Sequence, residues 1–135
     1  MQTRRKRTHL AGLEFELPIV NEKNEPVNFE VIYQATDRFI DTFSFLNVSR
    51  DDNEHIYLAV DDKTGDGLSY DCSYNTLKIS FGKEEDMNVL YKRFCQYYTY
   101  IQKKLRKEGH MLTGMGINPR YAVNQNVPVV SERYR

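Results

Sequence analysis

Two glutamates near the start of the chain, Glu14 and Glu16, have the spacing that most suggests chemistry. They alternate with the apolar residues Leu13, Phe15 and Leu17, which is the period-two pattern of a half-buried β-strand. On such a strand the two carboxylates point the same way and lie within about 7 Å of each other. Two like charges so close cost energy unless a cation lies between or near them.

Carboxylate ligands of this kind suit a hard divalent cation, Mg²⁺ or Mn²⁺, whose usual task in enzymes is to hold substrate phosphates. Asp71 is a third candidate ligand, because it lies in a later segment where apolar Tyr70 and Cys72 flank it, as on a facing strand. An ordinary solvent-facing sheet surface would also be polar, so that alternative stays open. The polar face expected from strand alternation holds Glu14, Glu16, Asp71, Thr76, Lys78 and Ser80.

The segments that would position these residues alternate between strand and helix patterns. Strands are expected at residues 13–17, 56–60, 68–73, 75–81 and 110–116, with a polar loop at 47–54. Helices are expected at residues 29–45, capped by Asn28, and at 84–107. This order predicts an α+β fold, a mainly antiparallel sheet with two helices packed on one face.

The second expected helix has apolar residues three and four positions apart, which predicts a core-facing stripe rather than a cofactor site. The stripe consists of Met87, Leu90, Phe94, Tyr97, Ile101 and Leu105.

The composition indicates one globular domain over residues 1–135, since 40% of the residues are hydrophobic and 13% are aromatic. Nineteen basic and nineteen acidic residues cancel, so the net charge favours neither nucleic acid nor membrane as a partner. The basic first residues have no apolar stretch behind them and do not resemble a secretory signal. Two cysteines, Cys72 and Cys95, without a CxxC motif predict reduced thiols in a cytoplasmic protein, although a disulfide between them stays open.

Three stretches in order resemble the glutamate–cysteine ligases, a family of glutamine-synthetase-like carboxylate–amine ligases. Residues 12–20 (GLEFELPIV) resemble the opening strand of that family, where two glutamates bind metal. Residues 70–80 (YDCSYNTLKIS) resemble its next functional pair of strands. Residues 112–119 (LTGMGINP), with Asn124 and residues 132–135 (ERYR), resemble the glycine-rich stretch and substrate-side loop. The resemblance covers the chain from about residue 8 onward.

The resemblance implies an activity and a set of site residues. Members of the family transfer the γ-phosphate of ATP to the side-chain carboxylate of glutamate, and the amine of cysteine then displaces the phosphate from the acyl phosphate. This reaction begins glutathione synthesis. By the same resemblance, Glu14, Glu16 and Asp71 would bind Mg²⁺ or Mn²⁺, and Asn118 and Arg120 would contact the amino-acid substrate. Magnesium would neutralise charge on the transferred phosphoryl group. ATP, glutamate and cysteine would be the small-molecule partners.

The sequence departs from the family pattern in two respects, which leave alternatives to the ligase open. Lys78 stands where the pattern has a third glutamate, and an ammonium group cannot ligate a cation. Lys78 would then replace one metal as an internal counter-ion among the acids. The chain is also too short for a complete ligase site, which predicts the N-terminal portion of a larger catalytic domain, inactive alone. A non-catalytic relative, a small α+β interaction module, and a homo-oligomer formed through an uncovered sheet all stay open.

Overall fold

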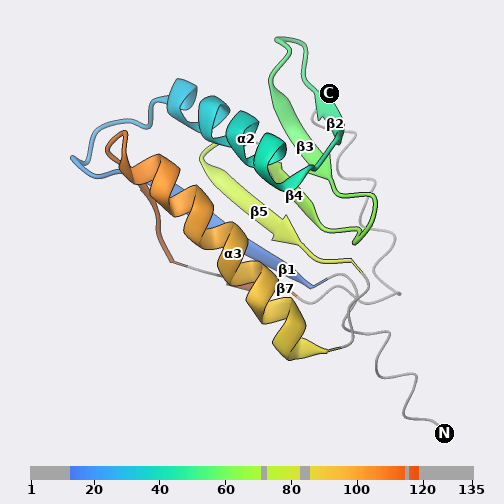
Figure 1. The fold of residues 1–135 in the computed structure, drawn as a ribbon. Helices are drawn as coiled ribbons and strands as arrows, with labels where there is room; N and C mark the ends of the chain where they lie inside the picture. Colours follow the sequence, from blue (N-terminus) through green and yellow to red (C-terminus); the bar gives the residue numbers. More distant parts are fainter. Residues whose placement is uncertain (1–12, 71–72, 83–85, 115, 119–135) are drawn as a thin grey trace, which may run out of the picture.

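The computed structural model describes residues 13–70, 73–82, 86–114 and 116–118. Within them the elements follow in the order β1 (Glu14–Asn21), α2 (Phe29–Phe43), β2 (Asn47–Arg50), β3 (Ile56–Val60), β4 (Gly67–Tyr70), β5 (Thr76–Ser80), α3 (Met87–Arg106), β6 (His110–Leu112) and β7 (Gly116–Asn118). The strands pair antiparallel in the order β2-β3-β4-β5-β1-β6, and β7 also pairs with β1. Both helices lie on one face of this sheet (Figure 1), so the predicted α+β class is confirmed.

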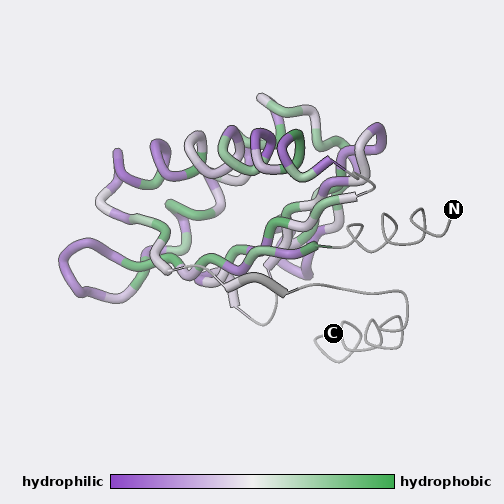
Figure 2. Tube along the Cα trace, turned by 90° about the horizontal axis from the view of Figure 1, so that it is seen from below, coloured by the Kyte–Doolittle hydropathy of each residue, from purple (hydrophilic) through white to green (hydrophobic). Residues whose placement is uncertain are grey.

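The core lies between the sheet and the helices, because the strand residues that face the helices are apolar. Phe15, Leu17 and Ile19 on β1 are buried, as are Leu77 and Ile79 on β5. Figure 2 views the same two layers from below and shows hydrophobic stretches alternating with hydrophilic ones along the chain. The opposite face of the sheet therefore receives the alternate, mostly polar residues.

Helix α2 begins as the sequence predicts and ends two residues earlier than expected. The side chain of Asn28 accepts a hydrogen bond from the backbone N–H of Glu30, which satisfies a donor at the first turn. Ser44 then adopts the left-handed conformation with φ of 60° and closes the helix after Phe43. This turn lets the chain reverse directly into β2.

Helix α3 buries five of its six predicted stripe residues: Leu90, Phe94, Tyr97, Ile101 and Leu105. Met87 is the exception, since it is 49% exposed at the first position of the helix. At this first turn, none of the elements within the described ranges covers the Met87 side chain. The prediction that Met87 belongs to the core is therefore wrong.

The loop predicted at residues 47–54 is partly a strand, β2, which pairs with β3 from Asn47 to Arg50. Its four residues show no buried face, so no alternation of apolar and polar residues announces it. Backbone pairing to β3 creates the strand, and the register shifts between Ser49 and Arg50 where it ends. Of the strand predicted at residues 68–73, the structure describes β4 up to Tyr70; residues 71 and 72 lie outside the described residues, and Ser73 is not in a strand.

The strand predicted at residues 110–116 is divided into β6 and β7, which both lie along β1. Ile19 pairs with Leu112 and Glu16 pairs with Gly116, so three steps along β1 oppose four steps on the other side. Pro18 lies at this irregularity, where its carbonyl accepts a hydrogen bond from the backbone N–H of Thr113 at 2.8 Å. A proline has no N–H to donate, and it is tolerated where the ladder is already interrupted.

A buried carboxylate ties the β3–β4 hairpin to α3. Asp66 is fully buried and accepts two hydrogen bonds from the guanidinium of Arg93, at 2.8 and 3.0 Å. It also accepts hydrogen bonds from the hydroxyl of Tyr97 at 2.6 Å and from the backbone N–H of Gly82 at 3.1 Å. Burial, and then the nearby carboxylate, raise the pKa of Tyr97. Four donors around one buried charge make this the polar anchor of the loop.

Close packing explains why position 82, next to the Asp66 cluster, is a glycine. A Cβ at Gly82 would lie 2.1 Å from the carbonyl oxygen of Thr64, which no side chain permits. The backbone of the 61–66 loop therefore passes directly against the end of β5, and only glycine allows the approach that brings the Gly82 N–H to Asp66.

Candidate functional site

Glu14 and Glu16 project from the face of β1 that is turned away from the helices. Their positions alternate with the buried Phe15 and Leu17, whose side chains face the core. Across the sheet, Glu14 pairs with Ser80 and Glu16 pairs with Lys78 on β5. The pleat therefore places both carboxylates and the Lys78 side chain on one surface.

Lys78 reaches both carboxylates. Its Nζ lies 3.9 Å from Oε1 of Glu14 and 3.6 Å from Oε2 of Glu16. The side chains of Lys78 and Glu14 are only 15% and 10% exposed, whereas that of Glu16 is 37% exposed. The ammonium group thus supplies the positive charge that two neighbouring carboxylates require, and this charge belongs to a side chain of the protein itself.

The triad of Glu14, Glu16 and Lys78 has small neighbours on both adjacent strands. Gly116 pairs with Glu16 on the β7 side, and a Cβ at Gly116 would meet no atom within 4 Å. Ser69 pairs with Lys78 on the β4 side and has only a small hydroxymethyl group. The open space at Gly116 therefore lies beside Glu16, the most exposed of the three side chains, whereas Glu14 and Lys78 are largely covered.

The remaining predicted site residues are only partly placed. Asp71 and Arg120 lie outside the described residues. The backbone of Asn118 pairs with Glu14 at the end of β7, which brings a predicted substrate-contacting residue beside a predicted metal ligand. Within the part of the chain that the structure describes, no group of three or more His, Cys, Asp or Glu residues is arranged to hold a metal ion. The metal ligands thus stay a prediction.

A second polar cluster, which the sequence did not indicate, lies where α2 meets the loops after β2 and β4. The ring of Tyr33 stacks on His55 with centroids 3.6 Å apart, and Tyr74 meets Tyr33 edge-on at 5.1 Å. The Tyr74 hydroxyl donates to Oδ2 of Asp51 at 2.7 Å, and Oδ2 lies 4.0 Å from Nδ1 of His55. Burial raises the pKa of Tyr33 and of Tyr74. Tyr33 lies 18 positions before Asp51 and Tyr74 lies 23 positions after it, so no local pattern could reveal the cluster.

Asp51 should make the stability of the protein depend on pH at the acidic end. The hydrogen bond from Tyr74 is the main cause that lowers the pKa of Asp51, and the backbone N–H groups of His55 and Asn53 add to it. A lowered pKa in the folded state gives stability that is complete above the unfolded value, about 3.9, and is lost as pH falls through the folded value. We therefore expect the stability difference between wild type and Asp51→Asn, measured by urea unfolding, to be smaller at about pH 3 than at about pH 6. These two pH values lie roughly one unit below and two units above the unfolded pKa.

Asp52→Asn provides the matched control for this measurement, because Asp52 is exposed and accepts no hydrogen bond from the described residues. Its difference from wild type should stay small at both pH values. A wild-type advantage over Asp51→Asn that persists unchanged at the acidic end would contradict the assignment.

Comparisons with known proteins give no relative: no protein-family model, curated protein or solved structure matches the chain. None of the helices within the described ranges is long and apolar enough to cross a membrane. Cys95 on α3 is a free thiol, and Cys72 lies outside the described residues.

Proposed function

We propose that the chain forms the N-terminal part of an ATP-dependent ligase that joins the side-chain carboxylate of glutamate to the amine of cysteine. The observation that carries this proposal is the placement of Glu14 and Glu16, side by side on the sheet face that the helices leave uncovered. A ligase of this class needs clustered carboxylates at an accessible surface, since they hold the Mg²⁺ or Mn²⁺ ions that bind the phosphates of ATP. The pairing of Asn118 with Glu14 supports the same site.

In this proposal each predicted site residue has a specific role. Glu14 and Glu16, with Asp71, hold a divalent cation, which neutralises charge on the phosphoryl group during transfer. Lys78 contributes a fixed positive charge at the position of one further cation. Asn118 and Arg120 orient the amino-acid substrate. We also infer a cytoplasmic location, which the free thiol of Cys95 supports.

A second candidate function is favoured by the distances of Lys78 itself. An ammonium group within 4 Å of both carboxylates already balances part of their charge and opposes the entry of a second cation. On this reading the chain is a non-catalytic relative of the ligases, a regulatory or interaction module whose former metal position is filled by Lys78.

Activity of the complete gene product distinguishes the two candidates. If the ligase proposal is right, the complete gene product should form γ-glutamylcysteine from glutamate and cysteine when ATP and Mg²⁺ are present. Chromatography of the product and assay of released phosphate measure this reaction. Glu14→Gln should lower kcat/KM by about a hundredfold or more, since even outer-shell partners of a metal are worth roughly 10- to 100-fold.

The matched control is Glu25→Gln, an exposed glutamate of the turn between β1 and α2 that removes the same charge far from the site. It should leave the rate within about twofold of wild type, as expected for a surface substitution. Absence of product from the complete gene product, with folding intact, would reject the ligase proposal and leave the non-catalytic candidate.

A further inference from the structure

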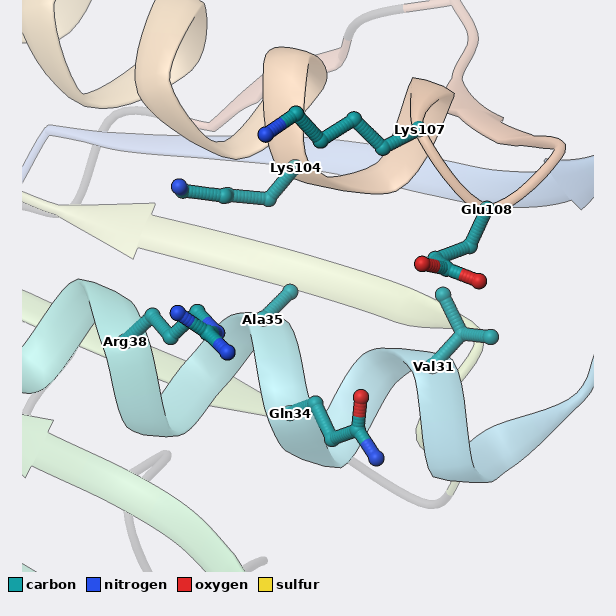
Figure 3. A pocket seen from close by; sticks show the side chains of 7 residues that line it. All are labelled: Val31, Gln34, Ala35, Arg38, Lys104, Lys107 and Glu108. Carbon is teal, nitrogen blue, oxygen red and sulfur yellow. The ribbon is translucent and has the colours of Figure 1, made fainter.

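A groove between α2 and α3 forms a second candidate binding site, separate from the sheet face that carries Glu14 and Glu16. It encloses about 210 Å³, and the apolar side chains of Val31 and Ala35 line it on the α2 side (Figure 3). This volume is smaller than the roughly 300–1,000 Å³ of pockets that enclose drug-sized ligands. A ligand here would be small.

The groove has an excess of positive charge, which comes from both helices. Arg38 projects from α2, while Lys104 of α3 and Lys107, which directly follows that helix, extend in a common direction, as Figure 3 shows. Glu108 is the single carboxylate among the lining residues. Within the described ranges, no carboxylate lies within 4.0 Å of the charged nitrogens of Arg38, Lys104 or Lys107.

Side-chain contacts between α2 and α3 hold the two walls of the groove together and position Lys104. Nζ of Lys104 lies over the ring of Tyr100 at 5.1 Å from its centroid. The hydroxyl of Tyr100 in turn accepts a hydrogen bond from Thr42 on α2 at 2.9 Å. The ammonium N–H groups that point away from the ring stay available to another acceptor. The side-chain amide of Gln34 adds donors that no described residue accepts.

Helix capping explains only part of this charge. Lys104 lies in the last turn of α3 and Lys107 directly follows it, where basic residues complement the negative end of the helix dipole. Arg38 lies in the interior of α2, so the dipole gives no reason for its position. Its guanidinium presents a planar fork of donors that matches a phosphate or carboxylate group with two hydrogen bonds.

We propose that the groove between α2 and α3 binds a small multivalent oxyanion of the phosphate type, with Arg38, Lys104 and Lys107 as its ligands. The three cations repel one another in the free protein, and an anion between them removes that repulsion. The apolar lining accommodates a short carbon segment attached to the anion. The proposal does not depend on ligase activity, because the groove and the Glu14–Glu16 surface lie on opposite sides of the sheet.

Inorganic pyrophosphate is the probe, titrated into the full chain without divalent cations and at constant ionic strength, with backbone amide NMR shifts as the readout. We expect saturable shifts in α2 and α3 at the groove. The double variant Arg38→Gln/Lys107→Gln should weaken binding at least about tenfold, the equivalent of roughly 1.4 kcal/mol.

Lys63→Gln/Lys92→Gln is the matched control, because it removes the same charge at exposed positions outside the groove. It should change the affinity by less than about twofold, as weak long-range screening of surface charges implies. Equal weakening by both double variants, or shifts that do not saturate, would overturn the proposal. Acetate at the same ionic strength should give no saturable shifts, and binding of acetate as tight as that of pyrophosphate would also overturn it.

Discussion

Replacing Asp66 with alanine should lower the free energy of unfolding by about 3–5 kcal/mol, the usual cost of breaking a buried charge pair. The change leaves the guanidinium of Arg93, which is only 19% exposed, without its bidentate partner. It also removes the acceptor of the Tyr97 hydroxyl and of the Gly82 N–H. Each donor left unsatisfied in the interior adds a desolvation cost. Urea unfolding followed by circular dichroism measures the difference.

Asp62→Ala is the matched control, since Asp62 belongs to the same hairpin loop but is exposed and interacts only with the side-chain amide of Asn47, at 3.3 Å, among the bonds of the described residues. Its effect should stay within about 0.5 kcal/mol, which is typical of a surface substitution. A comparable loss from both substitutions would mean that the loop, and not the buried carboxylate, sets the stability.

Replacing Lys78 with glutamate should convert the protein into one whose stability depends on a divalent cation. Without metal, the variant loses the positive charge between Glu14 and Glu16 and gains a third carboxylate among them, so it should unfold more easily than wild type. Addition of Mg²⁺ or Mn²⁺ should restore stability by about 2.7 kcal/mol when the free metal exceeds its dissociation constant about a hundredfold. Thermal unfolding with and without millimolar metal measures this recovery.

Lys78→Met separates metal binding from loss of the ion pair. The methionine variant removes the ammonium group but adds no ligand, so it should be destabilised without a strong response to metal. Wild type should respond less than Lys78→Glu, because the ammonium group occupies the space between the carboxylates. An identical metal response of the glutamate and methionine variants would show that this surface holds no cation site.

Several elements follow from local patterns alone, and the fold agrees with them. Alternation at Leu13, Phe15 and Leu17 predicts the strand that became β1, and the structure extends it to Asn21. The cap at Asn28 follows from the chemistry of its side chain, which satisfies a helical N–H within two residues. These features depend on neighbours along the chain, so the sequence suffices to predict them.

Features that depend on packing were missed. β2 exists because β3 offers a free edge, and its own residues have no strand pattern. Asp66, in the sequence, is one more acidic residue of a turn, yet it is fully buried by Arg93 and Tyr97, which are 27 and 31 residues further along. No local signal marks a charge whose partners come from a distant helix.

The sequence by itself determined the alternation that puts Glu14 and Glu16 on one surface, since side chains of a strand point to opposite faces in turn. Only the tertiary structure decided what lies between them. The antiparallel register of β1 and β5 places Lys78 opposite Glu16 and within reach of Glu14. Register arises from the burial of whole strands under the helices, and a shift of one residue would have turned Lys78 toward the core.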